Sequence, residues 1–157
     1  MTLQYREMRA DEADAVASMV AECFDRYVGS DFSAEGRAEF RRFSSAATIA
    51  GRMHDHWLLM ALGPSQEVAG VIEIRALRHV SLLFVAESFQ RRGIAAELMK
   101  RALARIAVED PSLREVTVNS SLFAVRAYER FGFVADGPEQ VTKGIRFVPM
   151  RRAVAKP

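Results

Sequence analysis

The segment Gln90–Ala95 has the residue types and the spacing that favour binding of an anion. Gly93 and Ala95 carry little or no side chain, so a phosphate can approach the backbone closely there. If a helix begins at this point, its first turn presents free backbone N–H groups and the positive end of the helix dipole. Arg91 and Arg92 add positive charge and forked hydrogen-bond donors. Taken alone, the segment fits equally well an ordinary turn between a strand and a helix, with solvated arginines.

The residues on either side of this segment predict the elements that would position it. Val80–Val85 is an apolar run with β-branched and aromatic residues, which is typical of a buried strand. After Gly93, apolar residues recur near the period of a helix, at Ile94, Leu98, Ala102 and Ile106. The sequence therefore predicts a buried strand, a polar bend and an amphipathic helix, with the anion site where the helix begins.

The segment Val85–Ala95 resembles the acyl-CoA signature of the GNAT superfamily of N-acetyltransferases, V-x-P-x-x-[QR]-x-x-G-x-[GA]. Gln90, Gly93 and Ala95 match the signature, whereas Glu87 stands where a proline is usual. A second family motif follows as Asn119-Ser120-Ser121, Ala124 and Tyr128-Glu129-Arg130-Phe131-Gly132-Phe133. Both motifs occur in the order and at the separation usual for the family. The chain is therefore similar to this family over nearly its whole length.

The resemblance implies an α/β fold, with a mixed, mostly antiparallel central sheet and helices on both faces, formed by one domain over residues 1–157. Hydrophobic patterning and turn residues agree with this order of elements. They predict strands at 3–9, 57–62, 68–75, 80–85, 115–118, 133–135 and 145–150, and helices at 11–27, from 33, from 93 and at 122–131. In this family the fourth and fifth strands splay apart. The resemblance thus implies a slot between Val80–Val85 and Val116–Asn119 for the pantetheine arm.

The resemblance also implies which residues bind acetyl-CoA and take part in acyl transfer. Backbone N–H groups near Phe84 and Val85 would stabilise the thioester carbonyl, and Asn119 would hydrogen-bond the pantetheine or nearby backbone. Tyr128 matches the tyrosine that protonates the departing thiolate, although its helical spacing would also let it pack in the core. The implied acetyl-CoA-binding residues are Leu83, Phe84, Val85, Gln90, Arg91, Arg92, Gly93, Ile94, Ala95, Asn119 and Tyr128.

Two residues are candidates for the base that takes the proton of the attacking amine. His79 heads the fourth predicted strand, and its reference pKa of about 6.5 suits a base at neutral pH. The alternation of a strand would place it on one face with Ser81, Leu83 and Val85. Glu73 is an acid within an apolar strand and is the rival candidate. Either could instead be a solvated residue at a sheet edge, and the amine could lose its proton to solvent with no dedicated base.

The region between the first two predicted helices usually lines the acceptor site in this family. Here it combines carboxylates with aromatic rings, a mixture that could hold a cationic amine by charge and by cation–π contact. These residues are Asp25, Asp31, Glu35, Glu39, Phe24, Tyr27, Phe32 and Phe40. A solvated pair of amphipathic helices would show the same composition.

Composition restricts the function classes further. The net charge of the 157 residues is +2, which does not favour a nucleic-acid partner. Cys23 is the single cysteine, on the apolar face of a helix, so we expect it in the core and expect no disulfide within the chain. His54 and His56 have no third ligand cluster nearby, so we expect no metal. Without an apolar run of membrane-spanning length or a signal peptide, a cytoplasmic location is expected, and the apolar C-terminal strand could pair across a homodimer.

These observations lead to one hypothesis and two alternatives. The hypothesis is an acetyl-CoA-dependent N-acetyltransferase that moves an acetyl group to the primary amine of a small molecule or an N-terminus by direct attack. The first alternative is acetylation of a protein lysine or an aminoacyl-tRNA, and the second is a non-catalytic acyl-CoA-binding regulatory module. No motif identifies the acceptor amine, the acyl-chain preference, the base or the oligomeric state.

Overall fold

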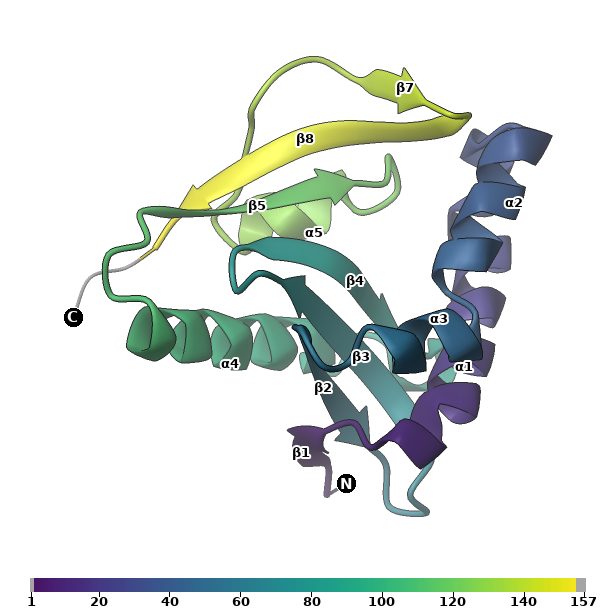
Figure 1. Cartoon of the computed structure of the whole chain (residues 1–157), viewed down its shortest axis with the longest axis vertical. Coiled ribbons are helices and arrows are strands. Elements are labelled where there is room, and N and C mark those ends of the chain that lie inside the picture. Colours follow the sequence, from purple (N-terminus) through teal and green to yellow (C-terminus); the bar gives the residue numbers. More distant parts are fainter. Residues whose placement is uncertain (1, 155–157) are drawn as a thin grey trace.

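The computed structural model describes residues 2–154 as a sheet with helices on both faces (Figure 1). The strands are β1 (Gln4–Glu7), β2 (His56–Leu62), β3 (Val68–Arg75), β4 (His79–Val85), β5 (Glu115–Ser120), β6 (Val134–Ala135), β7 (Gln140–Thr142) and β8 (Ile145–Ala153). The α-helices are α1 (Ala13–Tyr27), α2 (Ala34–Phe43), α3 (Ala46–Gly51), α4 (Ile94–Glu109) and α5 (Val125–Arg130).

The strands follow the order β1-β2-β3-β4-β5-β8-β6, and β7 pairs with β8. Neighbouring strands are antiparallel except for β4 and β5, which are parallel. The predicted mixed, mostly antiparallel sheet is therefore confirmed. β8 pairs with β5 on one side and with β6 and β7 on the other. Both edges of this strand pair within the chain, which argues against its pairing across a homodimer, and the possible homodimer stays a prediction.

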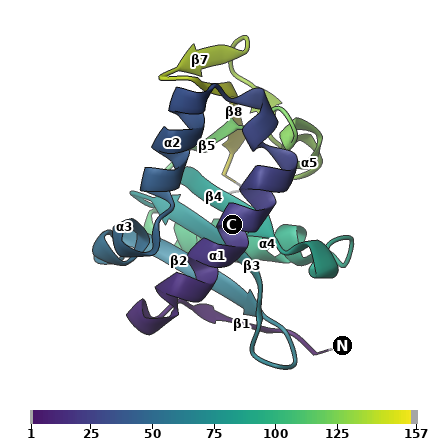
Figure 2. The same ribbon diagram turned by 90° about the vertical axis from the view of Figure 1, so that its right-hand side faces the viewer.

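The helices divide the core into parts on the two faces of the sheet. Helices α1, α2 and α3 cover one face, with α1 and α2 in front of the strands in Figure 2, while α4 and α5 pack on the other. On α4, the predicted apolar stripe of Ile94, Leu98, Ala102 and Ile106 is buried against the sheet. Burying one such aliphatic side chain fully contributes about 1.5–3 kcal/mol relative to leaving it exposed. This packing fixes α4, and with it the bend before the helix.

A bulge at Ser81 interrupts the pairing of β4 with β3. On β3, Glu73 pairs with Leu82. The next residue, Ile74, pairs with Val80, so Ser81 has no partner on β3. One extra residue in a strand shifts the alternation of side chains between the two faces of the sheet.

The bulge at Ser81 determines on which face of the sheet the His79 side chain lies. Val80 and Leu83 both pack in the core on the α4 side, although three positions separate them. Since His79 is next to Val80, its side chain points to the opposite face, on the α1 side. The expectation that His79 shares a face with Leu83 and Val85 is wrong, because strict alternation does not continue through a bulge.

The predicted splay between the fourth and fifth strands is confirmed. β4 and β5 pair over two residue pairs, His79 with Thr117 and Val80 with Val118. Beyond these pairs the two strands diverge. The β4 edge beyond Val80 faces no other described strand, so its backbone groups are open to a ligand, except the Val85 carbonyl, which accepts hydrogen bonds from the side chains of Gln90 and Cys23.

One α-helix and one strand of the described chain were not predicted. The region after α2 forms a further short helix, α3, because Ser45 caps it by accepting a hydrogen bond from the Thr48 N–H at 3.2 Å. The short strand β7 forms a hairpin with β8 through Lys143 and Gly144, both in the left-handed region. Within residues 2–154, no helix is long and apolar enough to cross a membrane.

Candidate active site

A cavity of about 970 Å³ follows the splay between β4 and β5. It is lined by residues of α1, α2, β4, the start of α4, β5, α5 and β8, and by the last residues of β3 and β7. One end reaches the start of α4, which we call the phosphate end. The other part lies between α2, the β3–β4 turn and the β7–β8 turn, and we call it the acceptor end. This volume is large enough for an extended cofactor arm and a small second substrate.

Gly93 forms the floor of the phosphate end. It is the N-cap residue of α4, and its φ of +78° lies in the left-handed region, which glycine adopts without steric cost. No side chain caps α4, so its first N–H groups are available to a ligand. A Cβ at Gly93 would meet no protein atom within 4 Å, so the space before the helix is open. This cradle fits a diphosphate.

The residues around Gly93 fix the shape of the bend. Gln90 Nε2 donates a hydrogen bond of 3.1 Å to the Val85 carbonyl, which ties the bend to the end of β4. Arg91 lines the cavity, whereas Arg92 lies outside the lining and its guanidinium sits 5.8 Å from the centre of the Phe89 ring. Arg92 is thus the exception among the predicted acetyl-CoA-binding residues. The others line the cavity, namely Leu83, Phe84, Val85, Gln90, Arg91, Gly93, Ile94, Ala95, Asn119 and Tyr128.

Cys23 lines the cavity, but its thiol is held by the backbone. Its Sγ donates a hydrogen bond of 3.3 Å to the same Val85 carbonyl that binds Gln90. Burial raises the pKa of the Cys23 thiol to about 11, so it is neutral at physiological pH. A neutral, hydrogen-bonded thiol is a poor nucleophile, and Cys23 acts as a packing residue.

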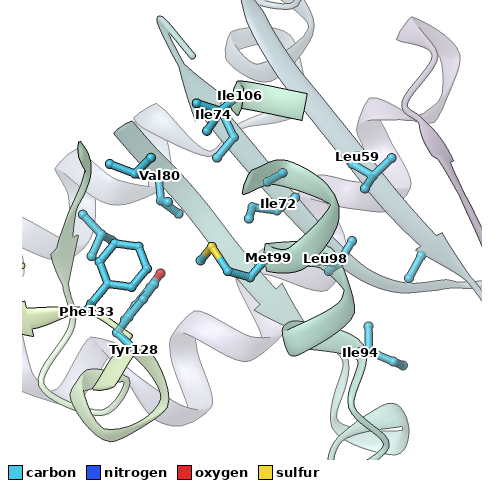
Figure 3. Packing of buried hydrophobic residues seen from close by; sticks show 14 of the residues in the cluster. Leu59, Ile72, Ile74, Val80, Ile94, Leu98, Met99, Ile106, Tyr128 and Phe133 are labelled. Atoms are coloured by element: carbon cyan, nitrogen blue, oxygen red, sulfur yellow. The ribbon is translucent and has the colours of Figure 1, made fainter. Parts of the chain in front are cut away.

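Tyr128 lies in the wall of the cavity and in the core at the same time. Its ring makes edge contacts with Phe131 and Phe133, at centroid distances of 6.2 and 5.4 Å. Figure 3 shows the Tyr128 ring beside Phe133, with its hydroxyl directed away from α5. Burial raises the pKa of the phenol, which keeps it protonated at neutral pH. Tyr128 is therefore a protonated phenol that lines the cavity while its ring packs against apolar neighbours.

His79 lines the cavity at the closed end of the splay. Its Nδ1 shares a hydrogen bond of 2.8 Å with Thr117 Oγ1, across the first pair of β4 and β5. Burial, aided by the positive charge of Arg75, lowers the pKa of His79 to about 4. The imidazole is therefore neutral at physiological pH, as a base must be, but it binds a proton weakly.

Glu73 does not reach the cavity. Its side chain is fully buried on the α1 side of the sheet, where Arg52 donates to both of its oxygens and His56 Nδ1 lies 2.7 Å from Oε2. Arg52 also donates to the Phe43 carbonyl. The structure therefore places Glu73 in a buried ion network and gives it no contact with a substrate. The His56 of the H-x-H pair belongs to the same network.

The acidic residues predicted to hold a cationic acceptor are mostly elsewhere. Glu39 is the member of this set that lines the cavity. It is paired with Arg42, whose hydrogen bond holds the pKa of Glu39 below its usual value. Asp25 forms an exposed ion pair with a residue of α2, and neither Asp31 nor Glu35 belongs to the lining. These carboxylates were predicted from the composition of the region, and composition does not show which side chains of a helix face the cavity.

The aromatic residues of this region do form the acceptor wall. Tyr27, Phe32 and Phe40 line the cavity. Phe24 is buried behind them and stacks on Phe40 at a centroid distance of 4.2 Å. Tyr27 also stacks on Phe123 of the β5–α5 loop at 4.9 Å, so an aromatic pair bridges α1 and this loop across the cavity wall.

Several cavity residues were not recognised from the sequence. Among them are Arg75, Phe123, Arg126, Lys143 and Arg146. A signal for Arg75 existed, because a short turn between two apolar strands predicts a hairpin in which Arg75 pairs with His79. No local pattern marked the others, because only the tertiary fold brings their loops to the cavity.

The comparisons with known proteins agree with this geometry. Residues 28–154 match the model of the acetyltransferase (GNAT) domain family. No curated protein matches the chain. Among solved structures, a GCN5-related N-acetyltransferase from Rhodopseudomonas palustris superposes with a TM-score of 0.80 at 19% identity, covering 98% of this chain and 96% of the other.

Two further solved structures were determined with ligands. The PaiA N-acetyltransferase from Thermoplasma acidophilum, in complex with coenzyme A, has a TM-score of 0.76 at 17% identity over 98% of this chain and 99% of its own. The spermidine N-acetyltransferase from Vibrio cholerae, in complex with CoA and spermine, has a TM-score of 0.67 at 16% identity, with coverages of 98% and 96%. At these identities the structures show a shared fold, and the matched domain shows the family. The chain belongs to the GNAT acetyltransferase family and is an acyl-CoA-dependent N-acetyltransferase.

Proposed function

We propose that this enzyme transfers an acetyl group from acetyl-CoA to the primary amine of a small molecule or an N-terminus by direct attack. The observation that carries the proposal is the continuity of the cavity. It runs along the splay from the helix start at Gly93, past Tyr128, to the acceptor end beside His79. Both substrates can therefore meet without a covalent enzyme intermediate. The neutral, hydrogen-bonded Cys23 leaves the lining without an activated thiol.

The residues present fit coenzyme A. The open N-terminus of α4 and Arg91 would hold the diphosphate. The unpaired β4 edge and Asn119 would bind the amides of the pantetheine arm. Coenzyme A in the Thermoplasma structure supports the same ligand for this fold. When bound, acetyl-CoA supplies a thioester carbonyl as the site of attack.

The chain would contribute orientation, one proton and a donor for the carbonyl oxygen. β4 backbone N–H groups near Phe84 and Val85 would stabilise the carbonyl oxygen as the amine nitrogen bonds to the carbonyl carbon. The C–S bond breaks, and Tyr128 gives its proton to the departing thiolate. With reference pKa values of about 10 for a phenol and 8.5 for a thiol, this transfer is uphill by about 2 kcal/mol before burial is considered. The attacking nitrogen gives up one proton to solvent, and the Tyr128 phenolate takes one proton back from solvent, so each turnover returns Tyr128 to its protonated form.

His79 is the base candidate that the geometry favours, because it lines the cavity and Glu73 does not. Its pKa of about 4 keeps it neutral but makes it a weak proton acceptor. We therefore propose that His79 passes the proton of the amine toward solvent, and that acceptor molecules with a neutral amine react.

Thiol release from acetyl-CoA over a panel of acceptors tests the function. The panel contains small primary amines, peptides with free N-termini, lysine peptides with blocked N-termini, and an aminoacyl-tRNA. We expect thiol release above the rate of acetyl-CoA hydrolysis with small amines or free N-termini, and a product heavier by one acetyl group in mass spectrometry. Turnover confined to lysine peptides or to aminoacyl-tRNA would favour the first alternative. Acetyl-CoA binding without turnover of any acceptor would favour a regulatory module.

A further inference from the structure

The charges that line the acceptor end of the cavity are mostly positive. Arg75, Lys143 and Arg146 line it, against the one carboxylate of Glu39 among the described lining residues. Glu39 is paired with Arg42, and Arg146 is paired with a neighbouring carboxylate. Among residues 2–154, neither Arg75 nor Lys143 has a carboxylate within ion-pair distance. The negative charge of Glu39 acts on Lys143 as well as on Arg42, so among the described lining residues of the acceptor end Arg75 is the cation without a nearby carboxylate.

Arg75 stands at the closed end of the splay. It is the last residue of β3 and pairs with His79, the first residue of β4. Its charge acts on the His79 imidazole, so the two side chains are close on the same face of the sheet. From His79 to Val85, β4 spans roughly 20 Å at the usual rise of a strand. Arg75 and the phosphate end therefore lie at opposite ends of the slot, with the reacting groups between them.

Arg75 in this setting suits an anionic group of the acceptor. A guanidinium offers planar, forked donors that match a carboxylate, and its charge persists at every physiological pH. The neighbouring His79 is neutral and does not compete for an anion. A polyamine would instead bring a further ammonium group toward Arg75, and like charges at short range repel. The electrostatic potential near Arg75 therefore favours an acceptor that carries negative charge.

Resting on the proposed function, we propose that the acceptor carries a carboxylate separated from its primary amine by an extended chain, and that Arg75 binds this carboxylate. The acceptor amine then lies toward β4 and the thioester. Lys143 sits on the β7–β8 turn, which is fixed to α2 by the 3.1 Å hydrogen bond from Ser33 N–H to the Gly144 carbonyl. Its charge lies near Glu39. The strand register aligns Arg151 of β8 with Thr117, His79 and Arg75, whereas Lys143 is eight positions before Arg151, so Arg75 is the candidate for the carboxylate. Arg75 is thus a residue that determines specificity.

Matched acceptors test this inference. Each amino acid of a series with increasing distance between amine and carboxylate is compared with its amide, and with the diamine of equal length. The amide keeps the amine and the size but removes the negative charge. For the preferred length, we expect kcat/KM to be at least about tenfold higher for the carboxylate than for the amide, the gain typical of a charge-assisted hydrogen bond. Spermidine is included, and we expect it to be a poorer acceptor.

Two variants and one control locate the carboxylate at Arg75. Arg75→Gln should raise KM for the carboxylate acceptor about tenfold or more, while kcat/KM for the amide and KM for acetyl-CoA stay within about twofold of wild type. Arg75→Lys should recover part of the loss. Arg78→Gln removes the same charge from an exposed residue of the same turn that does not line the cavity, and it should change neither acceptor. Measurements at mildly alkaline pH keep His79 neutral in every variant.

The outcomes separate the inference from the function on which it rests. Three results would overturn the inference and leave acetyl transfer standing. They are equal kcat/KM for carboxylates and amides, a higher kcat/KM for diamines or spermidine, and an equal loss of kcat/KM for both acceptors in Arg75→Gln. If no acceptor releases thiol although acetyl-CoA binds, the proposed function and the inference both fail.

Discussion

Arg52 and Glu73 form a two-point ion pair beneath the acceptor end of the cavity. Arg52 Nε lies 2.5 Å from Glu73 Oε2 and Nη2 lies 2.8 Å from Oε1. The Arg52 guanidinium also lies 3.9 Å from the centre of the Phe43 ring, and it donates to the Phe43 carbonyl. Because Phe43 lines the cavity, this pair joins β3 to the end of α2 and holds one part of the acceptor wall.

Loss of the Glu73 charge should cost stability rather than catalysis. We expect Glu73→Gln to lower the free energy of unfolding in urea by about 3 kcal/mol, because it leaves Arg52 buried without its counter-ion. The matched control is Glu115→Gln, whose half-exposed pair with Arg151 at 3.9 Å should contribute about 0–1 kcal/mol. Since Glu73 does not line the cavity, kcat of the folded variant should remain near wild type. A hundredfold fall in kcat without loss of stability would instead identify Glu73 as the base.

The ion network around Glu73 contains contacts that the sequence alone does not predict. An acid within an apolar strand predicts an unusual environment, and that part holds for Glu73. Its partner Arg52 is 21 positions earlier in the chain, and no local pattern links the two. The same limit applies to the bulge at Ser81, which depends on how β4 aligns with β3. The residue pattern within one strand does not determine how that strand aligns with its neighbour.

The approach of α2 to the β7–β8 turn gives a second prediction. A Cβ at Gly36 would lie 2.1 Å from the Gly144 carbonyl oxygen, so Gly36→Ala forces the turn away from α2. We expect a loss of about 1–3 kcal/mol in unfolding free energy and a higher KM for the acceptor, because both elements line the acceptor end. The control is Gly51→Ala, where a Cβ meets no atom within 4 Å. Comparable stability of both variants would show that the contact between α2 and the turn is loose.

The phosphate end gives the third prediction. Gly93→Glu places a negative charge at the open N-terminus of α4, and we expect acetyl-CoA affinity in calorimetry to fall at least about tenfold. Gly93→Ala separates geometry from charge, since a residue with a Cβ in the left-handed region costs about 1 kcal/mol. The control is Ser88→Glu, which adds the same charge at an exposed residue outside the lining. Equal affinity in wild type and Gly93→Glu would exclude this place for the diphosphate.

Removal of the Tyr128 hydroxyl gives the fourth prediction. Tyr128→Phe keeps the packing of the ring but deletes the proton donor, so we expect kcat to fall about a hundredfold with acetyl-CoA affinity nearly unchanged. Tyr27→Phe is the matched control, because Tyr27 lines the same cavity and its role is stacking on Phe123. Wild-type turnover in Tyr128→Phe, under conditions where chemistry limits the rate, would make Tyr128 a core residue only.

The parts of this site that the sequence predicts are those encoded by a short, continuous stretch of residues or by a family motif. The strand, bend and helix around Gly93 were predicted because a glycine, an apolar run and a helical stripe are all encoded within 80–106. Asn119 and Tyr128 were predicted through the family motif, and both line the cavity. The acceptor end could not be predicted in the same way. Its lining combines α2 with Arg75 and Lys143, which come from three separate parts of the chain. Only the tertiary fold brings these residues to one cavity.

The last prediction concerns the pH dependence that His79 can cause. Its pKa of about 4 in the folded protein lies below the reference value of about 6.5, so His79 stays neutral from pH 5 upward. A rise of kcat/KM between about pH 6 and 9 should therefore belong to the acceptor amine and should move when an amine of different pKa is used. His79→Gln should leave the position of this rise unchanged. Because a weak base accepts a proton poorly, the variant should lower kcat/KM by about tenfold or less.

The same lowered pKa of His79 gives this prediction a second readout, in the free energy of unfolding. Between pH 6.5 and 4 the unfolded chain binds a proton at His79 and the folded chain does not, so this group removes stability as the pH falls through that range. We therefore expect the difference in unfolding free energy between pH 7 and pH 5 to be smaller in His79→Gln than in wild type, measured in urea at both pH values. A rise in kcat/KM near pH 6.5 that disappears in His79→Gln, with no change in the acid sensitivity of folding, would show instead that His79 titrates at its ordinary pKa and acts as a strong base.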